Sequence, residues 1–250
     1  ISAEIAAAGD EAAGIEVAKK YNLCTPDGKL DGTQVKSVTL SNGTELMVQI
    51  AGFCHDDKTN GGKAGITFIF DGALASTDMD ANGTNDGGWE NAPVRSWLNS
   101  EGLANLPADL QKVIVPVDKL TNNIGETDDI SAVSVTSDYL WLFSFSELQE
   151  VNDAEEYASI LSAEGTIYKL FVDAAREGLT PEEEEYVNNK ALVRTDPPYW
   201  WGRTPNPDMK AGTPMAGRMH YFVMVSYDGY VSFLAEANGP NIGVIPGFCI

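Results

Sequence analysis

Two turn signatures constrain the fold of this chain more than any other feature. Asn42-Gly43 and Asp228-Gly229 each separate two segments of alternating apolar residues. Such pairs favour the tight turns that join antiparallel strands. We therefore expect one hairpin over residues 34–50 and a second over residues 220–235. Because helix-favouring segments occupy much of the remaining chain, the sequence predicts an α+β fold.

The N-terminal residues 3–21 are rich in alanine and predict a helix that Gly9 and Gly14 weaken. No repeat or linker divides the rest of the sequence. We therefore expect a helical extension over residues 1–30 and one domain over residues 31–250.

Within this domain, residues 65–70 and 139–145 are apolar and each predict a buried strand. Residues 92–114 suit two helices with a break near Pro107. Residues 150–190 hold 11 acidic and three basic side chains in helix-favouring sequence. Because this charge density resists burial, we expect an acidic helical insertion that the core does not need.

The charge excludes two classes of partner. Sixteen Lys and Arg face 37 Asp and Glu, so the formal net charge is −21. Phosphate backbones and anionic membrane surfaces repel such a chain. No run approaches the roughly 20 apolar residues of a membrane helix. We expect no nucleic-acid binding and no membrane insertion. The chain begins with Ile1 rather than Met, which is compatible with a processed N-terminus.

The three cysteines are too few for a disulfide framework and lack the spacing of a zinc site. We expect Cys24 to stay unpaired. The other two end the same tripeptide, Gly52-Phe53-Cys54 and Gly247-Phe248-Cys249. Either both are small buried thiols on core strands, or the strands through Ile50 and Val244 lie side by side. The second arrangement would bring the two sulfurs together, and a disulfide could then form in an oxidising compartment.

Familiar catalytic signatures are absent from the sequence. It contains no Gly-x-Ser-x-Gly elbow, no phosphate-binding loop and no dinucleotide fingerprint. His55 is followed by Asp56 and Asp57, and we expect this loop histidine to pair with carboxylates rather than to catalyse. Carboxylates abound, but nothing singles out an acid–base pair. We therefore expect no catalytic residues.

One string resembles the start of a calcium loop. Its candidate ligands are Asp78, Asp80, Asn82 and Asp86, with glycine at the sixth position. The twelfth position is Trp89, where such a loop has a bidentate glutamate, and no helix signal precedes the string. We expect a polar loop and no metal or cofactor.

Three motifs occur in one order: GGWE with RSWLN between residues 87 and 99, YWWGRTP at 199–205, and GVIPGF at 243–248. Over roughly residues 45–250 the chain thus resembles an uncharacterised domain family of bacteria and their phages, which carries GGW, RSWLN, WWLRSP and a terminal GVRPA. This chain departs from that pattern at Gly202, Thr204, Ile245 and Gly247. Any role of the family's arginine is therefore missing at Ile245.

That family is similar to C-type-lectin-fold domains of the formylglycine-generating type. It is also similar to the variable ligand-binding proteins of diversity-generating retroelements. The resemblance implies a C-type-lectin-like fold with paired N- and C-terminal strands, and a ligand surface in the C-terminal stretch, which is rewritten in the variable proteins. Formylglycine-generating activity is not implied, because its reactive cysteine pair lies in the C-terminal half, where this chain has Cys249 alone.

Residues 199–250 carry no net charge and are rich in aromatic side chains. We expect Trp200 and Trp201 to be core, and Tyr221, Val223 and Val225 to form the core face of their strand. The alternate positions and the nearby loops then supply the predicted ligand-binding surface, which comprises Arg203, Asn206, His220, Phe222, Met224, Tyr230, Ser232, Glu236 and Asn238. For Arg203 an alternative stays open, which is that it holds residues 199–205 in place.

Aromatic rings with small polar side chains are typical of recognition surfaces. We therefore expect a non-catalytic ligand-binding protein, a surface adhesin or receptor-binding protein. It would be extracellular, on a cell surface or on a phage virion, and would bind a protein or glycan ligand on another cell or virion. Two alternatives are an enzyme of formylglycine-generating-like fold that acts on glycans or peptides, and a structural component of a surface or virion assembly.

Overall fold

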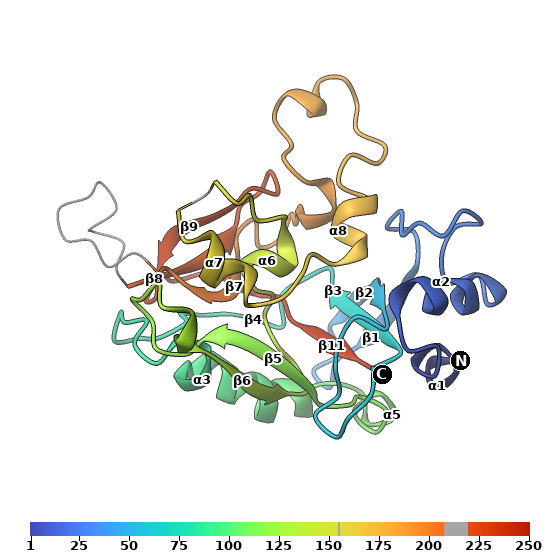
Figure 1. Ribbon diagram of the computed structural model, residues 1–250, viewed down its shortest axis with the longest axis horizontal. Helices are drawn as coiled ribbons and strands as arrows, with labels where there is room; N and C mark the ends of the chain where they lie inside the picture. Colours follow the sequence, from blue (N-terminus) through green and yellow to red (C-terminus); the bar gives the residue numbers. More distant parts are fainter. Residues whose placement is uncertain (155, 208–219) are drawn as a thin grey trace.

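Three sheets organise the protein, with short helices around them (Figure 1). The computed structural model describes residues 1–154, 156–207 and 220–250. The helices are α1 (Ser2–Ala6), α2 (Glu11–Lys20), α3 (Gly88–Asn91), α4 (Pro93–Trp97), the π-helix η1 (Leu98–Gly102), α5 (Ala108–Gln111), the 3-10 helix η2 (Ile130–Ala132), α6 (Phe145–Leu148), α7 (Ala158–Ser162), α8 (Lys169–Asp173) and the 3-10 helices η3 (Glu183–Glu185) and η4 (Lys190–Leu192). The strands are β1 (Val35–Thr39), β2 (Glu45–Phe53), β3 (Ile66–Phe70), β4 (Ala75–Ser76), β5 (Val117–Asn122), β6 (Val133–Asp138), β7 (Trp200–Pro205), β8 (Tyr221–Val225), β9 (Val231–Glu236), β10 (Gly243–Val244) and β11 (Gly247–Cys249).

The first sheet has the order β1-β2-β3-β11 and is antiparallel throughout. The second has the order β4-β10-β7-β8-β9, in which β10 and β7 are parallel and the other pairs antiparallel. The third is the hairpin of β5 and β6, which the sequence analysis does not predict. The α+β class is confirmed.

Both predicted hairpins form, but their turns are one residue longer than predicted. Leu40 and Thr44 close the first turn, and Ser226 and Tyr230 close the second, each by a hydrogen bond from the earlier residue's N–H to the later carbonyl. The glycines, Gly43 and Gly229, take left-handed φ of 87° and 76°. Each turn is therefore a three-residue loop that ends in a left-handed glycine, the next commonest way to join two antiparallel strands.

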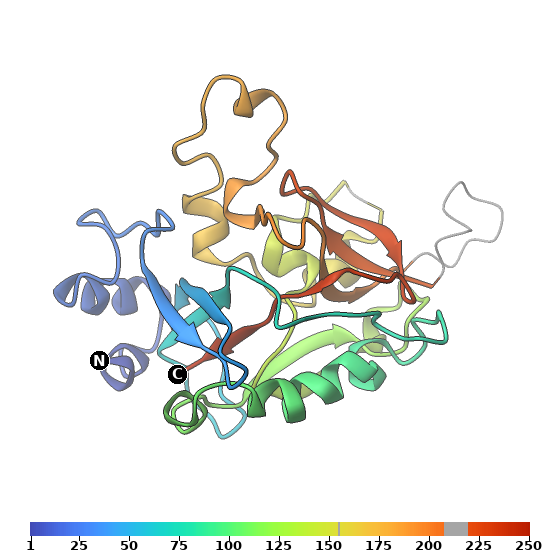
Figure 2. The same ribbon diagram turned by 180° about the vertical axis from the view of Figure 1, so that it is seen from behind.

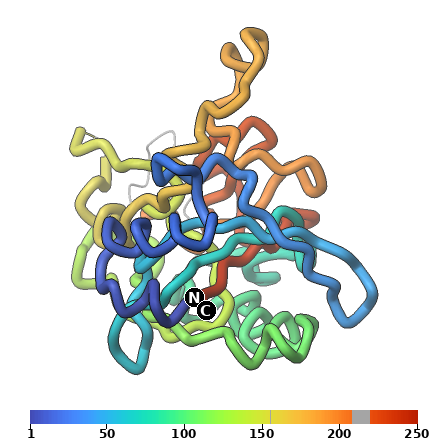
Figure 3. Tube along the Cα trace, turned by 90° about the vertical axis from the view of Figure 1, so that its right-hand side faces the viewer, coloured from blue at the N-terminus to red at the C-terminus, as the bar shows by residue number. Residues whose placement is uncertain are grey.

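The N-terminal helix is two helices rather than one. Gly9 lies between α1 and α2 with φ of 85°, a left-handed conformation that ends α1. Both helices pack on the first sheet: Ile5 is buried, and the Cα of Gly14 faces Phe53 and Cys54 closely enough that a Cβ would lie 3.0 Å from the cysteine sulfur. Ser2 Oγ donates to the carbonyl of Ile250, so the two chain ends meet (Figure 3).

The prediction of a strand over residues 139–145 is wrong. Residues 140–145 are buried, but Tyr139 is 41% exposed, Phe145 already begins α6, and the segment joins the first sheet through a single bridge, from Trp141 to Gly247. Leu140, Trp141 and Phe143 have no exposed area because sheets and helices surround them on every side. Complete burial produces the same apolar run as a central strand, so the sequence could not separate the two.

The segment 150–190 divides into two parts with opposite environments. The first part enters the core, with Ile160, Leu161, Tyr168, Leu170 and Phe171 buried. The part around η3 stands out from the body beyond α8 (Figure 1). The predicted acidic helical insertion is therefore not one surface element: the outer part alone lies outside the core, with the three-residue η3 as its helix, and the packing of the inner part argues against its being dispensable.

The alternative in which the strands through Ile50 and Val244 lie side by side, and bring Cys54 close to Cys249, is also wrong. Val244 lies in the second sheet, and β11 lies in the first sheet but is separated from β2 by β3. The C-terminal strand β11 thus pairs with β3 and shares a sheet with β1 and β2 without pairing with either. Cys24, Cys54 and Cys249 are buried free thiols, as in the first alternative.

Candidate functional site

The predicted ligand surface splits in two. His220, Tyr230, Glu236 and Asn238 are exposed, whereas the other five residues are buried: Arg203, Asn206, Phe222, Met224 and Ser232. These five are wrong as surface predictions: Phe222 and Met224 lie on β8, an inner strand between β7 and β9, and Arg203, Asn206 and Ser232 are at most 8% exposed. Trp200 and Trp201 are buried, as expected.

A shallow groove of about 430 Å³ crosses the outer side of β8 and β9. Its apolar lining comes from Met224, Leu234 and Ile242 and from the rings of Tyr199 and Tyr221. Met224 lines it with the little surface it exposes. Sequence reasoning identified Met224 and Glu236 in this groove and missed the others. The pairing of β8 with β9 shifts register between Phe222 and Met224, and this irregularity defeats simple alternation.

Exposed tyrosines extend this groove toward the tip of the second hairpin. Tyr227 is 58% exposed, and its ring meets that of Tyr199 edge-on with centroids 6.2 Å apart. Leu234 is 44% exposed. We call the set Tyr199, Tyr221, Met224, Tyr227, Leu234 and Ile242 the aromatic face. Glu236, which accepts a hydrogen bond from Tyr221 Oη at 3.1 Å, is the carboxylate that lines the groove.

A second cluster, of charged side chains, lies buried among all three sheets. Arg203 has no exposed area and donates to both carboxylate oxygens of Glu147, to the carbonyls of Leu120 and Leu142, and to Thr121 Oγ1. Every guanidinium nitrogen therefore has an acceptor within the protein. These bonds agree with the alternative for Arg203, which is that it holds residues 199–205 in place.

Lys119 extends the cluster toward the first sheet. Its Nζ lies 2.6 Å from Asp56 Oδ1 and 2.7 Å from Glu147 Oε1, and 4.5 Å above the ring of Trp141. Tyr168 donates to Asp56 Oδ1 at 2.6 Å. We call Asp56, Lys119, Glu147, Glu164, Tyr168 and Arg203 the buried ion cluster.

The charges of this cluster explain its pKa values. Two cations face three carboxyl groups, so one carboxyl lacks a full counter-charge. Burial raises the pKa of Asp56 and of Glu147, but the ammonium of Lys119 and the guanidinium of Arg203 outweigh it, and both pKa values are lowered. Burial prevails at Glu164, whose pKa is raised to about 7. Burial likewise raises the pKa of the Tyr168 hydroxyl.

Sequence reasoning missed this cluster, although one signal was available. Ser144 and Glu147 form a capping box at the start of α6, in which each side chain bonds the other's backbone N–H. The S-x-x-E spacing is visible in the sequence. It gives the helix start but not the long-range partners of Glu147. His55, which the sequence assigns to a carboxylate, has Nδ1 3.8 Å from Glu11 Oε2 and stacks on Tyr168.

The tryptophan motifs have structural roles in this protein. Asp138 accepts hydrogen bonds from Trp89 Nε1, Arg95 Nε and Asn99 Nδ2, so GGWE and RSWLN tie α3, α4 and η1 to β6 (Figure 2). Trp201 Nε1 donates to the carbonyl of Thr77. These side chains therefore anchor the sheets rather than face a ligand.

The calcium-like string forms turns. Asp80 Oδ1 accepts the N–H of Asn82 at 2.7 Å, and Thr84 Oγ1 accepts the N–H of Asp86 at 3.1 Å. Across residues 1–154, 156–207 and 220–250, no group of three or more His, Cys, Asp or Glu side chains could hold a metal ion. In the same ranges no helix has both the length and the apolar character needed to cross a bilayer.

The fold and its two clusters define an α+β domain with a closed ion cluster and an open aromatic face. Residues 64–250 match the model of a family described as a domain of unknown function, DUF6273, and the chain belongs to that family. Searches of curated proteins and of solved structures found no match.

Proposed function

We propose that this is a non-catalytic binding protein that recognises a partner protein through the aromatic face. The observation that carries the proposal is the exposure of apolar and tyrosine side chains around one groove, on a chain with formal net charge −21. Exposed apolar patches with tyrosine are typical of protein recognition. A face with little charge of its own lets an acidic protein approach a partner without strong repulsion at contact.

The buried ion cluster supports binding over catalysis. Its acids and bases bind one another, and each member is at most 4% exposed. A substrate could reach these groups only if the sheets separated. The cluster is therefore better suited to fixing the relative position of the three sheets.

We also propose, more finely, that the fold is C-type-lectin-like and that the protein acts as a surface adhesin or receptor-binding protein of the kind that retroelements diversify. The mixed fold, the antiparallel sheets and the ordered motifs support this proposal. If retroelements diversify this protein, exposed positions such as Tyr227, Leu234 and Asn238 would differ between copies, whereas the buried Phe222 would not. A reverse transcriptase and a template copy differing at adenines in the flanking DNA would support it, and their absence would remove the retroelement part.

Paired double variants test the binding face. Tyr227→Ser with Leu234→Ser alters the aromatic face, and Ile130→Ser with Val135→Ser alters similarly exposed side chains that do not line the groove. Both should change the free energy of unfolding by less than about 1 kcal/mol. A fluorescent tetramer of the chain is applied to arrays of purified cell-surface proteins and of glycans.

We expect binding to a protein on the array that the first double variant loses and the second keeps. Binding to glycans alone would replace the protein partner with a glycan. Equal losses in both double variants, or no binding on either array, would contradict the proposal.

A further inference from the structure

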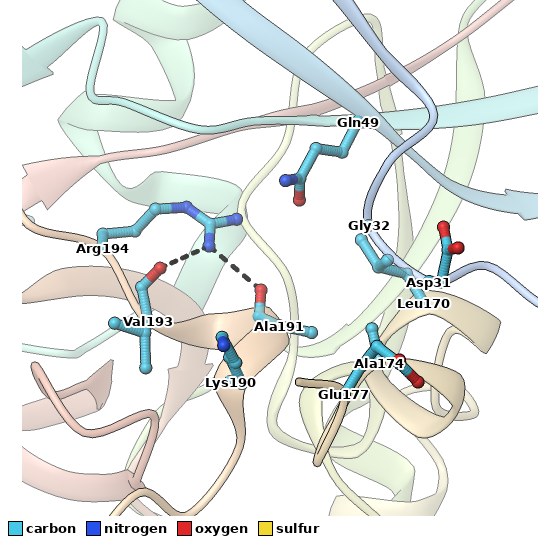
Figure 4. A pocket seen from close by; sticks show the side chains of 10 residues that line it. All are labelled: Asp31, Gly32, Gln49, Leu170, Ala174, Glu177, Lys190, Ala191, Val193 and Arg194. Carbon is cyan, nitrogen blue, oxygen red and sulfur yellow. Dashed lines mark hydrogen bonds between the residues drawn. The ribbon is translucent and has the colours of Figure 1, made fainter. Parts of the chain in front are cut away.

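A separate pocket of about 200 Å³ lies away from the aromatic face, between β2, α8 and η4 (Figure 4). Its charged and amide side chains are Asp31, Gln49, Glu177, Lys190 and Arg194. Sites for drug-sized ligands are about 300–1,000 Å³, so this pocket suits a smaller molecule.

Arg194 is the unusual residue of this pocket. It is 6% exposed, and no carboxylate in the described ranges lies within ion-pair distance of it. Its Nη1 donates to the carbonyls of Ala191 and Val193. Nε has no hydrogen-bond partner in the described part of the chain, and Nη2 reaches the carbonyl of Phe70 at 3.5 Å, the limit of a hydrogen bond.

The guanidinium is therefore half satisfied. Nε and Nη2 form the edge that a carboxylate bridges with two parallel hydrogen bonds. In Figure 4 the terminal nitrogen without a drawn bond points away from Val193 and toward Gln49. Burial lowers the pKa of Arg194 to about 10, although the Asp71 carboxylate acts in the opposite direction. An incoming anion would offset this desolvation.

The opposite side of the pocket carries two carboxylates, and the second cation of the pocket, Lys190, is already bonded through its Nζ to the carbonyl of Gly178 at 3.1 Å. Figure 4 places Asp31 and Glu177 across from Arg194. Hydrogen bonds from Thr33 lower the pKa of the Asp31 carboxyl, so it is ionised at neutral pH. These bonds occupy Asp31 Oδ1, while no bond to Oδ2 is seen within residues 1–154, 156–207 and 220–250. Glu177 is exposed and free to turn toward a ligand.

We infer that this pocket binds a small zwitterion of the free amino-acid class. Its carboxylate is held by Arg194, and its ammonium faces Asp31 and Glu177. The two ends of the pocket match the two charges of one molecule, which neither a simple anion nor a simple cation would do.

Matched ligands test both ends at once. Each standard L-amino acid is compared with its N-acetyl derivative, which lacks the ammonium, and with its amide, which lacks the carboxylate. Binding is measured by calorimetry and by the rise of the melting temperature. We expect at least one free amino acid to bind and both of its derivatives to bind at least about tenfold more weakly.

Variants assign the contacts. Arg194→Gln and Glu177→Gln should each weaken binding at least about tenfold. Arg176→Gln is the matched control, because Arg176 also donates to two backbone carbonyls of this segment but does not line the pocket. Circular dichroism checks folding, and Glu177→Gln carries the test if Arg194→Gln fails to fold.

Three results would overturn the inference. One is that no amino acid binds at millimolar concentration. Another is that the N-acetyl derivative binds as well as the free acid, which would leave a simple anion site. The third is that Arg176→Gln weakens binding as much as Glu177→Gln does.

Discussion

Glu147 accepts hydrogen bonds from Arg203 and lies 2.7 Å from Lys119, so one carboxylate joins two buried cations. A buried pair of this kind contributes little over a well-packed apolar pair, but the removal of one partner leaves an unpaired charge in the interior. The buried ion cluster therefore makes the protein sensitive to single changes at these positions.

Lys119→Met should lower the free energy of unfolding by about 3–5 kcal/mol, because it leaves Asp56 and Glu147 without their ammonium partner. Lys63→Met is the control, since Lys63 pairs with the exposed Asp57 and such surface pairs contribute at most about 1 kcal/mol. Denaturant titration measures both changes. A loss at Lys119 no larger than at Lys63 would contradict the cluster's structural role.

Glu164 predicts a specific pH dependence. Its pKa is about 7 in the folded protein and near its ordinary value of 4.5 in the unfolded chain. Between these values the folded state binds more protons, so stability falls as the pH rises from about 5 to 7.5. The loss should approach about 3 kcal/mol. In Glu164→Gln this decline should disappear, and a wild-type stability that is flat over this window would refute the assignment.

The lowered pKa values of Asp56 and Glu147 act in the opposite direction at lower pH. Their contribution is present above the ordinary carboxyl pKa and is lost as the pH falls below about 4. The two effects occupy separate windows, so one titration of stability against pH resolves them.

At the scale of elements, residue patterns correctly predicted the features that nearby residues determine. Both hairpins, the strand after Gly65 and the helix break at Pro107 follow from turn residues and alternation. The length of each turn did not, because the same turn residues also suit a loop of three residues. The environment of residues 139–145 did not either, because it depends on partners far away in the sequence. The surface prediction erred at β8 and β9, where Phe222 and Ser232 are buried and the register shift breaks the expected alternation.

The outer part of the acidic segment is expected to be removable. Replacing residues 179–186 with a short Gly/Ser linker should change the free energy of unfolding by less than about 1 kcal/mol, since loop closure depends weakly on length. Phe171→Ala in the inner part should cost about 3–5 kcal/mol because Phe171 is 1% exposed. Thermal and denaturant unfolding compare the two. A large loss from the loop replacement would show that the outer part also supports the core.

At the scale of the whole molecule, the ordered motifs and the buried ion cluster both hold the helices and sheets in their relative positions. Asp138 collects Trp89, Arg95 and Asn99, while Arg203 bonds residues of β5 and α6. The resemblance identified these motifs from the sequence, but their partners are distant in the chain and had no sequence signal. The aromatic face, by contrast, is formed by side chains that line the groove and take no part in these contacts.

The meeting of the chain ends at Ser2 and Ile250 makes the backbone nearly a closed ring. Joining the ends with a short linker and opening the chain within residues 179–186 would give a circular permutant that keeps every strand pair. Such a permutant should reproduce the native circular dichroism spectrum and melt cooperatively. If it does not fold, the continuity of residues 179–186 matters more to the domain than the contact between the chain ends.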